Sequence, residues 1–256
     1  MENLNYISKG TGPALVFQHG LTANIKQTES LLGGFPGVRL LSVDCPGHGK
    51  SKLPDNYLVS FNSYADGLIQ FLEKQDIEQA VFGGISMGSG IAINIALRYP
   101  EKVKGLILVR PAWLDGSDPE NLQILIPAAR LMNEYEGKAK FMELTSFKAI
   151  DLEPVAQSIL GVFASDQQPV LEKVIDRMVG DRPFTAMDQL AEIKVPCLVI
   201  GNEHDPLHPF EMAEKIHQEI PGSALDKITS RYIDNEQHSI EVRDSIEKFL
   251  KHNNLY

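Results

Sequence analysis

The chain has 256 residues, of which 43% are hydrophobic and 23% charged, so it has the composition of a globular protein and can bury a full core. Its formal net charge of −10 argues against nucleic acid or an anionic membrane surface as a partner. No apolar run approaches the length of a membrane span, and residues 1–5 show neither the basic nor the apolar segment of a secretory signal.

Short apolar strands alternate with amphipathic helices over much of the chain. The predicted strands cover residues 14–17, 38–43, 80–85, 105–109, 196–200 and about 224–228. The predicted helices cover residues 61–72, a segment beginning at Met87, and residues 210–220 and 240–250. This alternation predicts the α/β class, with a mostly parallel central sheet flanked by helices.

The alternation stops between about Ala112 and Met187, where the apolar residues follow helical spacing and no convincing strand is found. The segment is too long for a plain loop, and insertions of this kind commonly cover a binding site. We therefore expect an α/β core formed by residues 1–111 and 188–256, and a helical lid or cap formed by residues 112–187.

Cys45 and Cys197 lie at or beside the predicted strands, with no metal-ligand residues nearby in the sequence. Buried thiols without such partners are typical of reduced core cysteines. Together with the absence of a visible secretory signal, this favours a cytoplasmic protein.

The sequence Gly84-Ile85-Ser86-Met87-Gly88 places a serine where a buried strand runs directly into a helix. Such a turn holds the serine in a strained backbone conformation with its hydroxyl presented, and glycines on either side let strand and helix approach. A serine hydroxyl needs a base and nearby backbone N–H groups to act as a nucleophile. The motif therefore predicts nucleophilic chemistry at Ser86.

Five motifs in order give the chain a resemblance to the α/β-hydrolase superfamily over essentially its whole length. They are His19-Gly20, Asp44-x-Pro-Gly-His-Gly-Lys-Ser51, Gly84-x-Ser86-x-Gly88, the segment from Gly201 to Pro206 that contains Asp205, and Gln237-His238-Ser239. The chain order Ser, Asp, His is the order of this fold. The resemblance implies the α/β-hydrolase fold and catalysis by a serine triad, without a cofactor or a metal.

The resemblance assigns the triad to Ser86 as nucleophile, His238 as general base and Asp205 as the acid that orients the imidazole. His238 is expected just before the closing helix. Asp115 is an alternative acid, because it follows the strand after the nucleophile, where some relatives carry this residue.

The oxyanion hole is expected to be made by the backbone N–H groups of Leu21 and Met87. His19 is interpreted as a structural hydrogen-bonding residue. His204 and His208 flank Asp205 and could line the edge of the pocket, although solvated surface positions are the favoured interpretation for both.

Serine at the nucleophile position disfavours the epoxide hydrolase and haloalkane dehalogenase branches of the superfamily, which use aspartate there. We expect hydrolysis of a small-molecule carboxylic ester or lactone through an acyl-enzyme. C–C bond hydrolysis, peptide hydrolysis, acyl transfer and non-catalytic ligand binding remain as alternatives. The apolar residues of the insertion, among them Trp113, Phe141, Phe147 and Phe163, favour a bulky, largely apolar substrate.

Overall fold

The computed structural model describes residues 4–164 and 168–256, so residues 1–3, on which the expectation about a secretory signal partly rests, lie outside it. Within these ranges a seven-stranded sheet has the order β1-β3-β2-β4-β5-β6-β7. Only β1 is antiparallel to its neighbour. The strands are β1 (Tyr6–Lys9), β2 (Ala14–Gln18), β3 (Arg39–Val43), β4 (Ala80–Ile85), β5 (Val103–Val109), β6 (Cys197–Gly201) and β7 (Ala224–Lys227).

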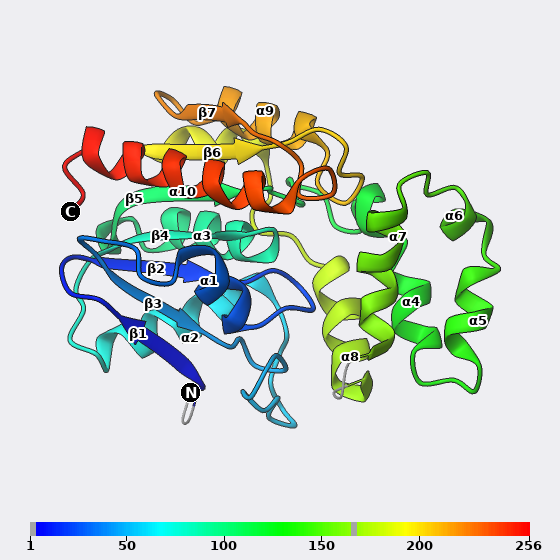
Figure 1. Cartoon of the computed structure of the whole chain (residues 1–256). Helices are drawn as coiled ribbons and strands as arrows, with labels where there is room; N and C mark the ends of the chain where they lie inside the picture. The colour runs from blue at the N-terminus through cyan, green and yellow to red at the C-terminus, as the bar shows by residue number, and fades with distance from the viewer. Residues whose placement is uncertain (1–3, 165–167) are drawn as a thin grey trace.

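Helices cover both faces of the sheet (Figure 1). One face packs against α1 (Ile25–Leu32) and α10 (Asn235–His252), and the other against α2 (Phe61–Glu73), α3 (Met87–Arg98) and α9 (Phe210–Glu219). Every residue of β4 is buried as a result. This explains why the central strands are continuous apolar runs instead of alternating patterns. The predicted α/β fold with a mostly parallel sheet is confirmed.

The described residues between β5 and β6 form helices and short turns and contain no strand. These helices are α4 (Leu125–Leu131), α5 (Gly137–Met142), α6 (Thr145–Lys148), α7 (Glu153–Leu160) and α8 (Gln168–Val179). Figure 1 shows them together at the end of the sheet toward which β2 and β6 point. The described residues also form the 3₁₀ turns η1 (Pro100–Lys102), η2 (Glu120–Leu122), η3 (Gly161–Ala164) and η4 (Met187–Glu192).

Large aromatic residues pack the helical insertion in two different ways. Phe141 is fully buried, with its ring centroid 5.1 Å from that of Phe147 and 5.4 Å from that of Phe163. Trp113 packs instead against Phe61 of α2, with ring centroids 5.3 Å apart. The three phenylalanines therefore form an internal core of the insertion, whereas Trp113 joins it to the α/β core.

The last helix begins earlier than the sequence pattern predicts, at Asn235 instead of residue 240. Its first turn is polar and has no apolar stripe. The turn is stabilised by Asp234, whose side chain accepts a hydrogen bond from Gln237 N at 2.9 Å. The expectation that His238 precedes the helix is therefore wrong, because His238 lies within its first turn.

Cys45 and Cys197 are both buried and free, in agreement with their interpretation as core thiols, and burial raises the pKa of each. Among the residues that the structure describes, no helix combines the length and the apolar character needed to cross a bilayer.

Candidate active site

Ser86 occupies a strained turn between β4 and α3, with φ 56° and ψ −112°. Neighbouring hydrogen bonds hold this conformation. Ser86 N donates to Val109 O at 3.0 Å, and Ser89 Oγ lies 2.8 Å from Gly84 O and 3.0 Å from Val109 O. The turn is thus fastened to both β4 and β5, which gives Ser86 a fixed position at the carboxyl end of the sheet.

The two glycines of the motif permit close backbone contacts. A Cβ atom on Gly84 would lie 2.4 Å from the carbonyl carbon of Gly88, and one on Gly88 would lie 2.3 Å from Gln18 O. Both distances are too short for any side chain. The predicted steric role of these glycines is confirmed.

The loop after β2 runs beside Ser86, because a Cβ atom on Gly20 would lie 3.5 Å from Ser86 Cβ. Leu21 follows in this loop, and Met87 is the first residue of α3. Neither backbone N–H has a hydrogen-bond acceptor among the described residues. Unpaired amides at a helix start and in an adjacent loop are suited to binding an anionic oxygen.

His19 stabilises this loop through two hydrogen bonds. Its Nδ1 atom donates to Gly20 O at 2.8 Å, while its Nε2 atom accepts from Cys45 N at 3.1 Å. These two bonds require the neutral Nδ1–H tautomer, and burial lowers the pKa of His19 in agreement. The structural role predicted for His19 is confirmed.

Asp205 follows β6, and its carboxylate is completely shielded from solvent. Its Oδ2 atom accepts from Arg110 Nη1 at 3.1 Å and from His208 Nδ1 at 2.9 Å, and its Oδ1 atom accepts from Leu207 N at 3.2 Å. Burial alone would raise the pKa of Asp205, but His208 and Arg110 hold it well below its usual range. The carboxylate is therefore ionised at neutral pH.

The histidine that Asp205 contacts is His208, whereas the sequence predicts His238. His238 Nδ1 instead donates to Thr229 O at 2.8 Å, and no hydrogen bond joins His238 to Ser86 or Asp205 within the described residues. His204 is exposed as expected. The surface position favoured for His208 is wrong, since its side chain is only 10% exposed.

Both candidate bases are neutral at pH 7. Burial lowers the pKa of His208 below its ordinary value, and the charges of Arg110 and Arg231 lower it further against the opposing effect of Asp205. Burial, followed by the charge of Arg110, lowers the pKa of His238 to about 4. Each ring has its Nδ1 atom engaged, so Nε2 is the atom that can accept a proton.

A cavity of about 110 Å³ lies over Ser86. Its apolar wall comes mainly from the helical insertion and contains Trp113, Leu122, Leu125, Ile159 and Val162. Its polar wall contains Arg110, His208, Arg231 and Tyr232, whereas His238 does not line it. Ser86 therefore faces a small space with one apolar side and one cationic side.

Asp115, the alternative acid, lies outside this cavity and lines a separate hollow with Pro119 and Met212. Its backbone oxygen accepts from Arg182 Nη1 at 3.3 Å. The structure therefore does not bring Asp115 to Ser86, whereas Asp205 contacts three residues of the cavity wall, Arg110, Leu207 and His208.

Asn121 joins the insertion to the loop that carries His208. Its Nδ2 atom donates to Leu207 O at 2.7 Å and to Ala112 O at 3.2 Å. The beginning of the insertion and the Asp205–His208 loop are therefore held together by one side chain.

Comparison with known proteins identifies the family. The family model described as serine aminopeptidase, S33, an α/β-hydrolase family, matches residues 12–242. The chain belongs to this family.

The chain is also similar to individual proteins. The chain is 36% identical over 106 residues to a protein of Mycobacterium phage D29 named as a non-heme haloperoxidase, a match that covers 40% of this chain and 37% of that protein. It is 25% identical to Lipase 3 of Moraxella sp. (strain TA144), over 82% of this chain and 68% of the lipase.

Among solved structures, the enol-lactonase from Burkholderia xenovorans LB400 superposes with a TM-score of 0.75 at 21% identity, covering 97% of this chain and 96% of that one. At this identity the likeness shows the shared fold alone.

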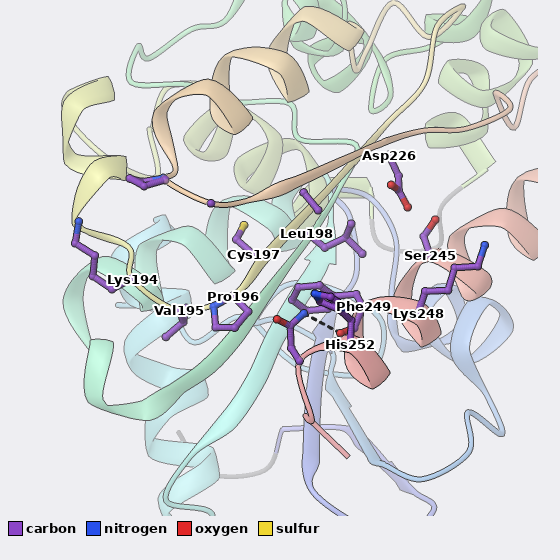
Figure 2. A pocket seen from close by; sticks show the side chains of 14 residues that line it. Lys194, Val195, Pro196, Cys197, Leu198, Asp226, Ser245, Lys248, Phe249 and His252 are labelled. Atoms are coloured by element: carbon purple, nitrogen blue, oxygen red, sulfur yellow. Dashed lines mark hydrogen bonds between the residues drawn. The ribbon is translucent and has the colours of Figure 1, made fainter.

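A second hollow in this hydrolase lies away from Ser86, beside β6 and α10. Figure 2 shows Lys194 and Cys197 on one side of it and Lys248, Phe249 and His252 on the other. None of the predicted site residues lines it. Within the described ranges, no group of three or more His, Cys, Asp or Glu side chains is placed to hold a metal ion.

Three basic residues of the Ser86 cavity were not predicted from the sequence, or were given another role: Arg110, His208 and Arg231. Arg110 directly follows β5, and His208 and Arg231 lie in the connections after β6 and β7. The carboxyl ends of parallel strands meet at one edge of a sheet, which is where such sheets bind ligands. This position was the signal that could have indicated them.

Proposed function

We propose that this α/β-hydrolase cleaves a carboxylic ester or a lactone, with Ser86 as the nucleophile. The observation that carries the proposal is the strained turn at Ser86, which faces a cavity next to two backbone amides without a partner among the described residues. Attack of Ser86 Oγ on the substrate carbonyl would form a tetrahedral intermediate. The N–H groups of Leu21 and Met87 would stabilise its oxyanion.

Asp205 is the triad carboxylate in this proposal and orients the histidine that acts as the base. His208 is favoured as the base, because it is hydrogen-bonded to Asp205 and lines the same cavity as Ser86. Its Nε2 atom would take the Ser86 proton and deliver it to the leaving alcohol; the acyl-enzyme would then be released by water activated in the same way. His238, the base that the family resemblance predicts, is the second candidate.

The cavity also bears on substrate size. Its apolar wall supports an apolar acyl or alcohol group, as the sequence predicts. A volume of about 110 Å³ is well below the roughly 300–1,000 Å³ of sites that enclose drug-sized ligands. In the conformation described, the space accommodates a small group, and a bulky substrate would require displacement of part of the insertion.

The proposal is supported by a relative named as a lipase and by the shared fold of an enol-lactonase. The name of the family model also makes peptide hydrolysis a candidate, since the same acyl-enzyme would form from a peptide bond.

A fluorophosphonate probe tests the proposal, because it reacts with an activated serine. We expect one adduct per chain, at Ser86, and loss of labelling and of ester turnover in Ser86→Ala. Ser245→Ala is the matched control, since Ser245 is also 8% exposed but lies in α10. A panel of para-nitrophenyl esters, lactones and peptide anilides then identifies the bond cleaved.

Labelling that persists in Ser86→Ala would refute a serine nucleophile at this position. An unlabelled wild-type protein that still binds ester analogues would favour a non-catalytic ligand-binding protein.

A further inference from the structure

The cavity over Ser86 contains more positive than negative charge. Arg110 and Arg231 both line it, and no Asp or Glu does so among the described residues. Asp205 lies directly behind the wall and pairs with Arg110. Arg231 forms no ion pair with a described residue and lies over the Tyr232 ring, 5.4 Å from its centroid. With His208 neutral, two cations face one anion.

Arg110 is the more unusual of the two arginines. It is only 4% exposed, and its Nε atom is buried without a hydrogen-bond partner in the described part of the chain. Asp205 is the one carboxylate that pairs with its guanidinium there. A guanidinium has five N–H donors, and leaving such donors unpaired in a protein interior is costly.

The backbone of Arg110 is held in an unusual conformation. Arg110 has a left-handed conformation with φ 48°, and its N–H donates to Ile200 O at 2.7 Å. A strained, hydrogen-bonded backbone directly after β5 directs the side chain to the carboxyl end of the sheet, beside the Ser86 turn. Strain of this kind is typical of functional positions.

We propose that the substrate of this site carries a carboxylate, which binds to Arg110 and Arg231 while its ester carbonyl lies at Ser86. The proposal rests on the hydrolase function proposed above and specifies its substrate class. A monoanion balances the excess of one positive charge, whereas a doubly charged phosphate would exceed it. Arginine also matches the planar carboxylate through paired hydrogen bonds.

The local charge contrasts with that of the whole chain, which has a formal net charge of −10. Both arginines also lower the pKa values of His208 and His238, after the larger effect of burial, so their field extends over both candidate bases. A bound carboxylate would offset this field. The apolar wall of the cavity would contact the rest of the acyl chain.

A matched pair of substrates tests the proposal. The para-nitrophenyl monoester of glutaric acid and para-nitrophenyl valerate have acyl chains of the same length and differ in whether the chain ends in a carboxylate or a methyl group. We expect kcat/KM to be at least about tenfold higher for the glutaric ester, as a charge-assisted contact implies. Arg231→Gln should lower the ratio of the two values by about the same factor.

Arg243→Gln is the matched control, because Arg243 also lies over an aromatic ring, 5.5 Å from the Phe35 centroid, but belongs to α10. It should leave the ratio unchanged. Equal kcat/KM values for the two esters, or a ratio that Arg231→Gln does not alter, would overturn the proposal.

A binding measurement separates this proposal from the proposed function. Glutaric acid monoanilide and valeranilide are titrated calorimetrically into the Ser86→Ala protein, where no bond is cleaved. Selective binding of the acidic anilide, weakened by Arg231→Gln, would support carboxylate recognition even if the wild-type protein hydrolysed neither ester. Equal binding of both anilides would refute recognition even if hydrolysis were observed.

Discussion

The carboxylate of Asp205 is shared between a cation and an imidazole. Arg110 and His208 both approach its Oδ2 atom. The contacts with His208 and Arg110 keep Asp205 ionised, and the contact with His208 also orients the imidazole ring. Removing either partner would therefore affect the other two residues.

At this scale we predict that His208→Gln lowers kcat for a neutral ester by about 10²–10⁴-fold, because it removes the proposed general base. His238→Gln should have a much smaller effect, since His238 is bonded to Thr229 O and does not line the cavity. Steady-state kinetics of both variants on the same ester provides the test. Circular dichroism and melting curves show whether each variant is folded.

If His238→Gln abolished activity while His208→Gln was mild, the base predicted from the family resemblance would be the correct one. His208 would then be a positioning residue that acts on Asp205.

Site residues that belong to a local sequence motif could be predicted from the sequence. Residues that reach the site only through the fold could not. Ser86 and its glycines were recognisable because five consecutive residues determine the turn. The pairing of Asp205 with His208 was not, because an Asp three residues before a His looks like an ordinary loop. The charge of Arg110 near Ser86 also becomes visible only when β4 and β5 are placed side by side.

The same distinction holds for the secondary-structure elements. The buried strands β2 to β6 were predicted to within about two residues, since each is a continuous apolar run. β1 was missed because it is a four-residue edge strand with mostly exposed side chains, and α1 because its eight residues are largely polar. The cap at Asp234 made the start of α10 earlier than its apolar residues indicate.

At the scale of the elements, the insertion contains two groups of apolar side chains with different roles. Ile159 on α7 lines the Ser86 cavity, whereas Phe141, Phe147 and Phe163 pack on one another and do not line it. Of the four aromatic residues that favoured a bulky, largely apolar substrate in the sequence, Trp113 is therefore the one that borders the cavity.

We predict that Ile159→Ala enlarges the cavity and shifts the preference among straight-chain para-nitrophenyl esters toward longer acyl groups. Phe141→Ala should leave this order unchanged and destabilise the fold by about 3–5 kcal/mol, the usual cost of removing a buried Phe ring. Chain-length profiles and denaturant unfolding curves measure the two effects. An altered chain-length preference in folded Phe141→Ala would show that the internal core of the insertion also sets specificity.

For the whole molecule, the buried histidines make the free energy of unfolding depend on pH. The pKa values of His19, His48, His208 and His238 all lie below the ordinary value of 6.5, with burial as the largest cause in each case. Below about pH 6.5 the unfolded chain therefore binds protons that the folded chain does not. Stability must fall as the pH falls through this range.

We predict that the free energy of unfolding decreases between pH 6.5 and pH 4, by up to about 1.4 kcal/mol per pH unit for each of these histidines. Asp205 contributes little in this window, because its pKa is lowered and its stabilisation is lost only below the ordinary value of 3.8. Thermal melts across the pH range measure the effect, and His238→Gln should reduce the slope. A melting temperature that stays constant from pH 7 to pH 4.5 would contradict the prediction.

The hydrogen bonds of Asn121 connect the insertion that covers the cavity with the loop that carries His208. Because the amide holds Leu207 O and Ala112 O together, an outward movement of the insertion's first segment would pull on the loop that positions His208. If His208 is the base, as proposed, it would be aligned with Ser86 only while the insertion keeps the position described. With the insertion displaced, Ser86 would lack its base and would be a poor nucleophile. Water that enters with each new substrate would then find the base not yet aligned for proton transfer.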